Sequence, residues 1–270
     1  MTKHYEEILE MKKPKTSEVG FEVKHEWPHL YPFQKYCVRT ALKKGRFALF
    51  EGCGDGKTRQ QLTFAHEVVD HTERPVLILA PLAVVDQTIE EAIKIGYECI
   101  EYLQEMYTMQ PLPATIYITN YEQLDNIPVE EFGGVVLDES SILKSFTGKT
   151  KRMLVEYFKD TPYKLACSGT PAPNDLNEYG NHSEFLNVLD AQDMRAKWFV
   201  RDEGMNNYRL KGHAKDSFYA WLRTWCIMFN KPAEIGYPMP GYDLPKVHYT
   251  DVVIKAAVRE NGKLHNEGHI

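Results

Sequence analysis

Short apolar runs alternate with amphipathic segments along much of this chain of 270 residues. Runs of a few apolar residues between polar or glycine positions are typical of buried parallel strands. They predict strands at residues 48–50, 76–80, 115–119, 135–138 and 164–168. Apolar positions at helical spacing predict helices at residues 32–44, 60–69, 83–95 and 149–158. The alternation predicts an α/β fold in which helices flank a parallel sheet on both faces.

The pattern changes after Asn174. Residues 177–229 are aromatic-rich and helical in pattern, so we expect helices and no further strand there. Pro and Gly residues interrupt the segment 232–245, which is typical of a linker, and apolar positions at 247–258 indicate the start of another strand. The first 24 residues are charged and poorly patterned, and we expect them to be a loosely ordered lead-in.

Composition restricts the class of protein. A hydrophobic content of 43% is enough for a sizeable core, and the net charge of −6 means that any contact with nucleic acid has to be a local patch. No apolar run approaches the roughly 18 residues of a membrane span, and the N-terminal residues lack the apolar core of a signal peptide. The five cysteines form no C-x-x-C pair, which argues against a zinc site. We therefore expect a cytoplasmic protein without a membrane segment.

A glycine-rich turn, Gly54-Asp55-Gly56-Lys57-Thr58, lies between the first predicted strand and the helix after it. Backbone N–H groups of such a turn, together with the positive end of the helix, bind phosphates. Lys57 would reach the β- and γ-phosphates, and the Thr58 hydroxyl would bind Mg²⁺. Glu51 stands where the common pattern has its first glycine, so the turn by itself also fits an ordinary helix start.

Two carboxylates, Asp138 and Glu139, follow the apolar run Val135-Val136-Leu137. Open α/β sheets bind their ligands at the carboxyl ends of the strands, and a buried carboxylate pair there needs a compensating cation. Bound Mg²⁺ would supply that cation. Asp138 would then hold the metal, and Glu139 would orient and activate the attacking water.

Six segments occur in the order of the motifs of superfamily 2 helicases, and the chain resembles the Swi/Snf-related members of that superfamily. The resemblance covers about residues 30–189. In order, the segments are Leu30-Tyr31-Pro32-Phe33-Gln34, the phosphate loop from Glu51 to Gln60, Leu77-Ile78-Leu79-Ala80-Pro81-Leu82, Ile118-Thr119-Asn120-Tyr121-Glu122, Asp138-Glu139-Ser140-Ser141, and Ser168-Gly169-Thr170-Pro171-Ala172-Pro173-Asn174. An acidic residue at position 51 is usual for the Swi/Snf-type phosphate loop. Together with the later stretch from Gly212 to Trp225, the Asp-Glu-Ser-Ser sequence is similar to helicases common in phages.

The resemblance implies a RecA-like P-loop ATPase fold and a role for each motif. Lys57, Asp138 and Glu139 would be catalytic, and Thr58 and Asp138 would bind Mg²⁺. The ATP-binding residues would be Gln34, Gly52, Cys53, Gly54, Asp55, Gly56, Lys57, Thr58 and Arg59. Gln34 would pair with adenine, and the hydroxyls of Ser168 and Thr170 would couple the acidic pair to the rest of the sheet. Contacts to nucleic-acid phosphates would come from Pro81, Leu82, Thr119, Asn120, Tyr121 and Lys144, although each of these also fits an ordinary solvated loop.

The chain also departs from the family pattern. Ser140-Ser141 replaces the Ala-His of DEAH-type members and removes an imidazole that links the acidic motif to the Ser-Gly-Thr motif. Motifs IV to VI, which belong to a second RecA-like domain with an arginine finger, are not found. Four arginines after the last motif lie in no recognisable finger motif: Arg195, Arg201, Arg209 and Arg223.

We accordingly expect four parts: the lead-in at 1–24, a first RecA-like domain at 25–190, a helical extension at 191–235, and at 236–270 a linker with the start of a second RecA-like domain. That second domain would act in cis or in trans. Three tryptophans of the extension are either a base-stacking surface or, as we favour, helical core: Trp198, Trp221 and Trp225.

The predicted function is the N-terminal ATPase part of a DNA translocase or helicase, with double-stranded DNA translocation preferred over strand separation. Turnover by these 270 residues alone would be very slow. One alternative is a catalytically incomplete module that binds ATP and nucleic acid as a regulator or partner subunit. Another is a P-loop kinase, against which Asp138-Glu139 and Ser168-Gly169-Thr170 argue.

Overall fold

The structure is a computed structural model that describes residues 19–103, 112, 115–144, 148–201, 208–242, 249–250, 258–260 and 263–265. Residues 1–238 belong to one compact unit and residues 239–270 to a second. In the second unit, β10 (Val258–Glu260) and β11 (Lys263–His265) pair as an antiparallel hairpin. Most of the strand predicted at 247–258, and residues 1–18 of the predicted lead-in, lie outside the described residues.

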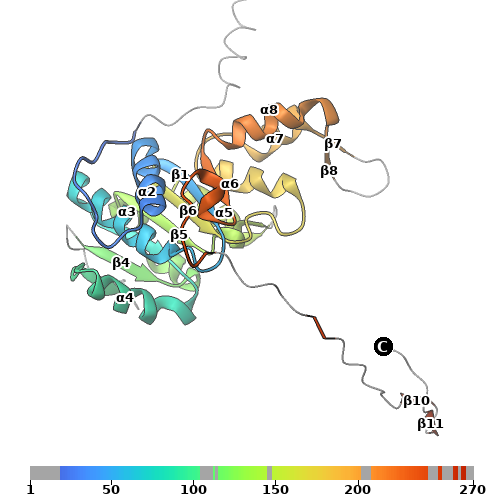
Figure 1. The fold of residues 1–270 in the computed structure, drawn as a ribbon, viewed down its shortest axis with the longest axis horizontal. Coiled ribbons are helices and arrows are strands. Elements are labelled where there is room, and N and C mark those ends of the chain that lie inside the picture. The colour runs from blue at the N-terminus through green and yellow to red at the C-terminus, as the bar shows by residue number, and fades with distance from the viewer. Residues whose placement is uncertain are drawn as a thin grey trace, which may run out of the picture. The chain divides into compact units, whose positions relative to one another are not determined.

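A parallel sheet of seven strands forms the centre of the first unit (Figure 1), in the order β3-β4-β2-β5-β6-β1-β9. Every neighbouring pair in it is parallel. The strands are β1 (Arg46–Glu51), β2 (Val76–Leu79), β3 (Ile100–Tyr102), β4 (Ile116–Thr119), β5 (Gly134–Asp138), β6 (Tyr163–Ser168) and β9 (Cys226–Phe229). The predicted α/β class and the five predicted strands are therefore confirmed.

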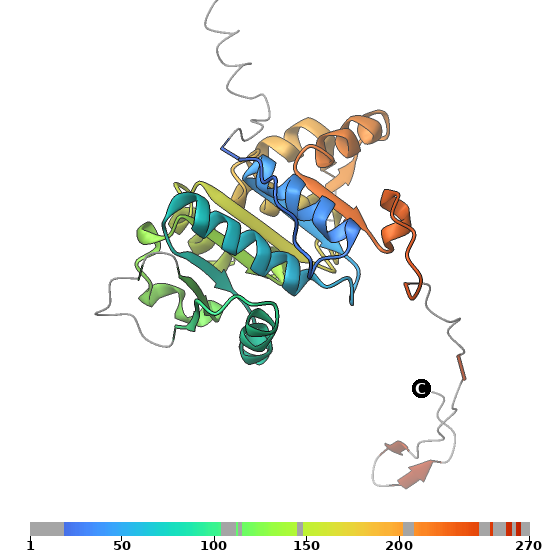
Figure 2. The ribbon, with the colours of Figure 1, turned by 60° about the vertical axis from the view of Figure 1, so that its left-hand side comes forward.

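Helices flank the sheet on both faces (Figures 1 and 2). On one face α2 and α3 pack together over the central strands, with α4 beside α3, and α5 to α8 lie on the other face. The helices are α2 (Pro32–Lys44), α3 (Lys57–Thr72), α4 (Val85–Lys94), α5 (Lys149–Tyr157), α6 (Tyr179–Phe185), α7 (Ala191–Trp198) and α8 (Lys215–Leu222). Short 3-10 helices connect them: η1 (Leu82–Val84), η2 (Tyr121–Asn126), η3 (Val129–Glu131), η4 (Ser140–Lys144), η5 (Leu176–Glu178), η6 (Gly212–Ala214) and η7 (Pro232–Ile235). None of the helices in the described part of the chain is long and apolar enough to cross a membrane.

The continuous apolar strands are explained by burial on both faces of the sheet. Alternate side chains of one strand, such as Leu77 and Leu79 of β2, belong to the large core that includes α5 to α8. Ile78 between them is also fully buried, on the α2–α3 face. Because every strand ends at the same edge, the loops after β1, β2, β4, β5 and β6 are brought together there.

The expectation of helices and no further strand within residues 177–229 is wrong. Cys226–Phe229 forms β9, which pairs in parallel with β1 and completes the sheet, and β7 (Phe199–Arg201) and β8 (Tyr208–Leu210) form an antiparallel hairpin. The strand β3 was also not predicted. Each is only three or four residues long, so periodicity cannot separate it from the helical pattern beside it. Pairing with a neighbouring strand decides its conformation.

The three tryptophans of the extension are core residues, as favoured from the sequence. Trp198, Trp221 and Trp225 are buried, and the rings of Trp198 and Trp221 stack with their centroids 4.7 Å apart. Such rings are not available to stack on nucleic-acid bases.

Candidate functional site

The phosphate loop connects β1 to α3, and its shape requires glycine at two positions. Gly54 and Gly56 have φ of +89° and +75°, in the region that other residues rarely adopt. A Cβ on Gly56 would lie 2.4 Å from Nε2 of Gln34, so this position also has no room for a side chain. Lys57 then begins α3, which places the positive end of a 16-residue helix at the loop.

Lys57 lies over this loop. Its ammonium donates hydrogen bonds to the carbonyl oxygens of Glu51, at 3.1 Å, and Gly52, at 2.8 Å. The lysine is therefore already held at the loop by two backbone acceptors, and Thr58 follows it in half-buried surroundings. Cys53 is exposed. Arg59 points elsewhere, since its guanidinium pairs with Glu91 of α4.

Gln34 connects α2 to the phosphate loop. Its Oε1 accepts from the backbone N–H of Tyr31 at 2.9 Å, and its Nε2 donates to the carbonyl oxygen of Asp55 at 2.8 Å. The side chain is buried, so its amide supports the loop here. Recognition of adenine by Gln34 stays a prediction.

Two carboxyl groups are buried here, that of Glu51 at the end of β1 and that of Asp55 in the loop itself. Glu51 accepts a hydrogen bond from Nε2 of Gln60 at 2.6 Å, but within the described part of the chain its Oε1 has no hydrogen-bond partner, and neither has Oδ2 of Asp55. Burial raises the pKa of Glu51 to about 7 and also raises the pKa of Asp55. Glu51 at this position is thus a carboxyl group that the fold keeps partly protonated near neutral pH.

The acidic pair lies at the end of β5, next to α3 and β6. Asp138 Oδ1 accepts from Nε2 of Gln61 at 2.7 Å, and Glu139 Oε1 accepts from the Ser168 hydroxyl at 2.7 Å. Glu139 has φ of +55°, a left-handed conformation that is strained for a residue with a side chain. Ser168 is therefore in contact with the acidic pair. Thr170 takes part through its backbone N–H, which donates to the Ser168 hydroxyl at 2.9 Å, and its own side chain is exposed.

The residues at this edge fit Mg²⁺, which prefers oxygen ligands and keeps several waters. Asp138 offers a carboxylate and Thr58 a hydroxyl. The Gln61–Asp138 hydrogen bond brings the start of the helix that carries Thr58 next to Asp138. Burial raises the pKa of Asp138, and a bound cation would reduce that cost of ionisation.

A cavity of about 640 Å³ opens beside Glu139. It collects residues from the loops after β2, β4 and β5, and its lining includes five of the six residues predicted to contact nucleic acid: Pro81, Leu82, Asn120, Tyr121 and Lys144. The sixth, Thr119, does not reach it. Thr119 is fully buried, and its hydroxyl donates to the carbonyl oxygen of Leu103 at 2.7 Å.

Several residues that contact the acidic motif were not predicted to do so. The Tyr121 hydroxyl donates to the carbonyl oxygen of Asp138 at 2.6 Å, and Gln61 donates to its carboxylate. From α6, His182 contacts Ser140. Gln61 lies one turn after Lys57 and could have been suspected from that spacing. His182 lies 42 residues from Ser140, and no sequence signal connects them.

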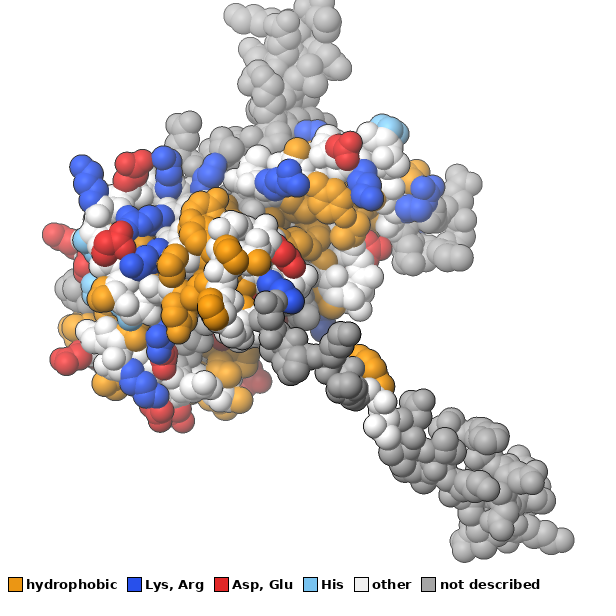
Figure 3. Space-filling model, in the orientation of Figure 1, with side chains coloured by type: hydrophobic (Ala, Val, Ile, Leu, Met, Phe, Trp, Pro, Cys, Tyr) orange, Lys and Arg blue, Asp and Glu red, His pale blue; other side chains and the backbone are white. Residues whose placement is uncertain are grey.

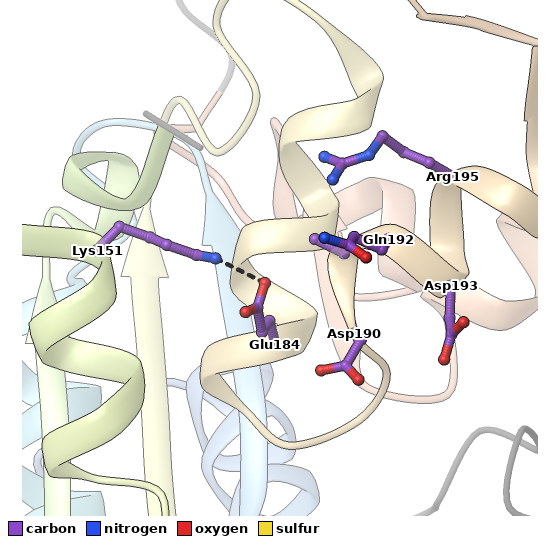
Figure 4. A pocket seen from close by; sticks show the side chains of 7 residues that line it. Lys151, Glu184, Asp190, Gln192, Asp193 and Arg195 are labelled. Carbon is purple, nitrogen blue, oxygen red and sulfur yellow. Dashed lines mark hydrogen bonds and ion pairs between the residues drawn. The ribbon is translucent and has the colours of Figure 1, made fainter. Parts of the chain in front are cut away.

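A second cavity, of about 360 Å³, lies between α5, α6 and α7 (Figure 4). Lys151 and Glu184 form an ion pair in its lining with an Nζ–Oε2 distance of 2.6 Å, and Asp190, Asp193 and Arg195 complete the charged lining. None of the residues predicted for ATP or nucleic acid lines this cavity.

No protein-family model matches the chain. It is 29% identical over 161 residues to the SWI/SNF-related matrix-associated actin-dependent regulator of chromatin subfamily A-like protein 1 homolog of Caenorhabditis elegans, which covers 54% of this chain and 23% of that protein. It is 28% identical over 157 residues to the DNA annealing helicase and endonuclease ZRANB3 of Mus musculus, which covers 53% of this chain and 14% of that protein.

Among solved structures, the chain is similar to the Sulfolobus solfataricus SWI2/SNF2 ATPase core in complex with dsDNA, with a TM-score of 0.61. At 20% identity, the match covers 80% of this chain and 46% of that one, and it supports the RecA-like fold. The chain thus spans less than half the length of each of these relatives.

Proposed function

We propose that this chain, which carries a superfamily 2 ATPase domain of the Swi/Snf-related type, is the ATP-binding half of a motor that moves along double-stranded DNA. One observation carries the proposal. The phosphate loop, the acidic pair and the Ser-Gly-Thr motif meet at one edge of the sheet and are joined by the Gln61–Asp138 and Ser168–Glu139 hydrogen bonds.

Each group then has a task in ATP hydrolysis. The loop N–H groups and Lys57 would bind the phosphates, and Gln34 would contact adenine. Thr58 and Asp138 would hold Mg²⁺, which when bound would offset the negative charge of the phosphates. Glu139 would orient the attacking water and accept its proton. Ser168 donates a hydrogen bond to the Glu139 carboxylate. Breaking or keeping this hydrogen bond would couple the state of the site to movement of the motor.

The cavity beside Glu139 is the proposed contact for the DNA backbone. Lys144 and the end of η2 line it together with Glu139, so a bound phosphate would lie beside the catalytic carboxylate. Basic side chains are also spread over α7 and α8 (Figure 3). Residues 191–225 carry seven Lys and Arg and four Asp and Glu, whereas the whole chain has 32 and 38. Such contacts would be independent of sequence and sensitive to salt.

A second RecA-like domain, in cis or in trans, would complete the motor by adding an arginine to the γ-phosphate. The alternative of a non-hydrolysing binding module is less favoured, because the relatives include a DNA annealing helicase and a SWI2/SNF2 ATPase core. Turnover measurements with and without DNA separate the two. A screen of phosphoryl acceptors tests the kinase alternative.

The first test is nucleotide binding. We expect the chain to bind Mg-ATP more tightly than Mg-GTP, and Lys57→Ala to weaken ATP binding roughly 10- to 100-fold, because it removes charge-assisted hydrogen bonds to phosphate. Gln34→Ala should reduce the preference for ATP over GTP. Titration of fluorescent ATP and GTP measures both effects, with Lys94→Ala, on the exposed end of α4, as the control. Equal affinities for the two nucleotides, or unchanged binding by Lys57→Ala, would refute the proposed site.

A further inference from the structure

Helix α6 contacts the segment that follows the acidic pair. Its residue His182 places Nε2 3.2 Å from the hydroxyl of Ser140, and both side chains are fully buried. Ser140 is the next residue after Glu139. An imidazole therefore reaches an acidic motif whose own sequence has none.

The neighbouring residue of α6, Asn181, holds the other end of the same segment. Its Nδ2 donates to the carbonyl oxygens of Leu143, at 2.7 Å, and Lys144, at 3.2 Å. The last carbonyl groups of a short helix have no partner within that helix, so this amide satisfies acceptors that the helix itself leaves free. Two consecutive residues of α6 thus fix both ends of η4, the 3-10 helix Ser140–Lys144.

The position of η4 matters because it connects two parts of the proposed site. Glu139 immediately precedes it and Lys144 ends it, and both line the cavity of about 640 Å³. Glu139 is in a left-handed conformation, which persists only where the surroundings hold it. Ser168 holds the Glu139 side chain, and the contact between His182 and Ser140 holds the backbone that follows.

His182 also touches the strand that leads to the phosphate loop. Its ring and that of Phe50 pack edge to face, with centroids 5.1 Å apart and planes at 84°. Phe50 directly precedes Glu51. One side chain therefore contacts both the acidic segment and the base of the phosphate loop. Burial lowers the pKa of His182 to about 4, so the ring is neutral at physiological pH.

We propose that His182 is a positioning residue for ATP hydrolysis. Through Ser140 it fixes the backbone at Glu139, so its loss lowers the rate of the chemical step and leaves the affinity for ATP unchanged. Asn181 supports it by holding the far end of η4. This inference rests on the proposed function and adds to it a residue outside the six motifs.

Four variants of the full protein test this role: His182→Leu, Ser140→Ala, the double variant of these two, and His182→Gln. Turnover of ATP is measured for each in the presence of duplex DNA. We expect each of the first two to lower kcat about 10-fold without a change in the Kd for ATP, because a small displacement of a catalytic group is costly. The double variant should be no slower than the slower single variant, because both remove the same contact. His182→Gln, whose amide can reach Ser140, should recover most of the rate.

An independent readout does not depend on turnover. Amide hydrogen exchange at residues 139–144 should be about 10-fold faster in His182→Leu and in Ser140→Ala, and unchanged in His213→Leu, at an exposed histidine of η6. Should the leucine variant fail to fold, Ser140→Ala and His182→Gln carry the comparison.

The positioning role of His182 and the proposed function can be refuted by different results. Absence of ATP hydrolysis by the wild-type protein in every context would contradict the proposed function, and the exchange measurement would still test the role of His182. Unchanged exchange, full kcat in Ser140→Ala, multiplicative losses in the double variant, or a loss confined to ATP affinity would each overturn the positioning role.

Discussion

The phosphate loop and the acidic loop after β5 lie at the same edge of the sheet but are held in different ways. Lys57 binds carbonyl groups five and six residues away, and glycine conformations shape the turn. The acidic loop depends on remote residues, since Gln61 is 77 positions from Asp138, Ser168 is 29 from Glu139 and His182 is 42 from Ser140. The first loop is shaped mainly by nearby residues, with remote support from Gln34 and the carbonyl oxygen of Phe229, whereas the second is assembled by the packing of α3, β6 and α6.

This difference indicates which substitutions should affect each loop. A substitution in the phosphate loop alters the loop itself, while the acidic loop is sensitive to residues that belong to no motif. Substitutions in the two loops should also change different measured quantities. Damage to the phosphate loop should appear in nucleotide affinity, and damage to the supports of the acidic loop should appear in the rate of hydrolysis.

The largest expected effect concerns the rate. ATP turnover by these 270 residues alone should be very slow even with DNA, because in the proposed motor a second RecA-like domain would supply the arginine that stabilises charge on the γ-phosphate. Adding that domain, fused or as a separate chain, should raise kcat by about 10³–10⁵, or about 4–7 kcal/mol of barrier. Phosphate release measures it, and Glu139→Gln should abolish the gain. Rapid DNA-stimulated hydrolysis by a verified monomer of this chain would contradict this expectation.

A second prediction tests whether the buried carboxyl group of Glu51 supports the phosphate loop. Glu51 is buried at the end of β1, and its pKa of about 7 lies above its ordinary value of 4.5. Below pH 4.5 the carboxyl group is protonated in both the folded and the unfolded chain. As pH rises towards 7 the unfolded chain loses the proton first, so the wild type loses up to about 3 kcal/mol of its free energy of unfolding.

Glu51→Gln should remove this pH dependence. We expect the variant to be more stable than the wild type by about 3 kcal/mol at pH 8 and of similar stability at pH 4, since glutamine can still accept the hydrogen bond from Gln60. Urea denaturation at the two pH values measures the difference. A variant that is less stable than the wild type at pH 8 would show that the ionised carboxylate supports the loop.

The smallest expected effect lies outside both loops. Lys197 and Lys215 are exposed on α7 and α8, and their replacement by Gln should weaken DNA binding while nucleotide affinity stays unchanged. If both contact phosphates, the slope of log K against log salt should fall by about 0.9 for each. Fluorescence anisotropy with duplex DNA at several salt concentrations measures it. Replacement of Lys43 and Lys159, which are exposed but paired with Glu22 and Glu156, is the matched control. Tight, sequence-selective binding that persists in high salt would contradict the expected mode of contact.

The fold class and most of the candidate site could be predicted from the sequence alone. Five strands could be predicted because a strand buried on both faces has to be continuously apolar. The turn at Gly54 and Gly56 could be predicted because only glycine combines that backbone with a close approach to phosphate. The order of six motifs then placed Lys57, Asp138 and Glu139 at one edge of the sheet. These signals are local in the chain, so they can be read without coordinates.

Features that depend on contacts between distant segments could be found only in the folded structure. It made Cys226–Phe229 a strand through pairing with β1, and it buried Thr119 away from the cavity that its neighbours Asn120 and Tyr121 line. It also buried Lys164 inside β6, where the ammonium donates to the carbonyl oxygen of Phe185 at 2.9 Å and burial lowers its pKa to about 7.

The same reason applies to His182. Nothing in the residues around it indicates an imidazole next to the acidic motif, because its partners Ser140 and Phe50 belong to η4 and β1, which are distant in the sequence. Periodicity and motifs describe what a residue does within its own segment. Which residue completes the acidic loop depends on how α6 packs against η4, and that packing is a property of the folded chain as a whole.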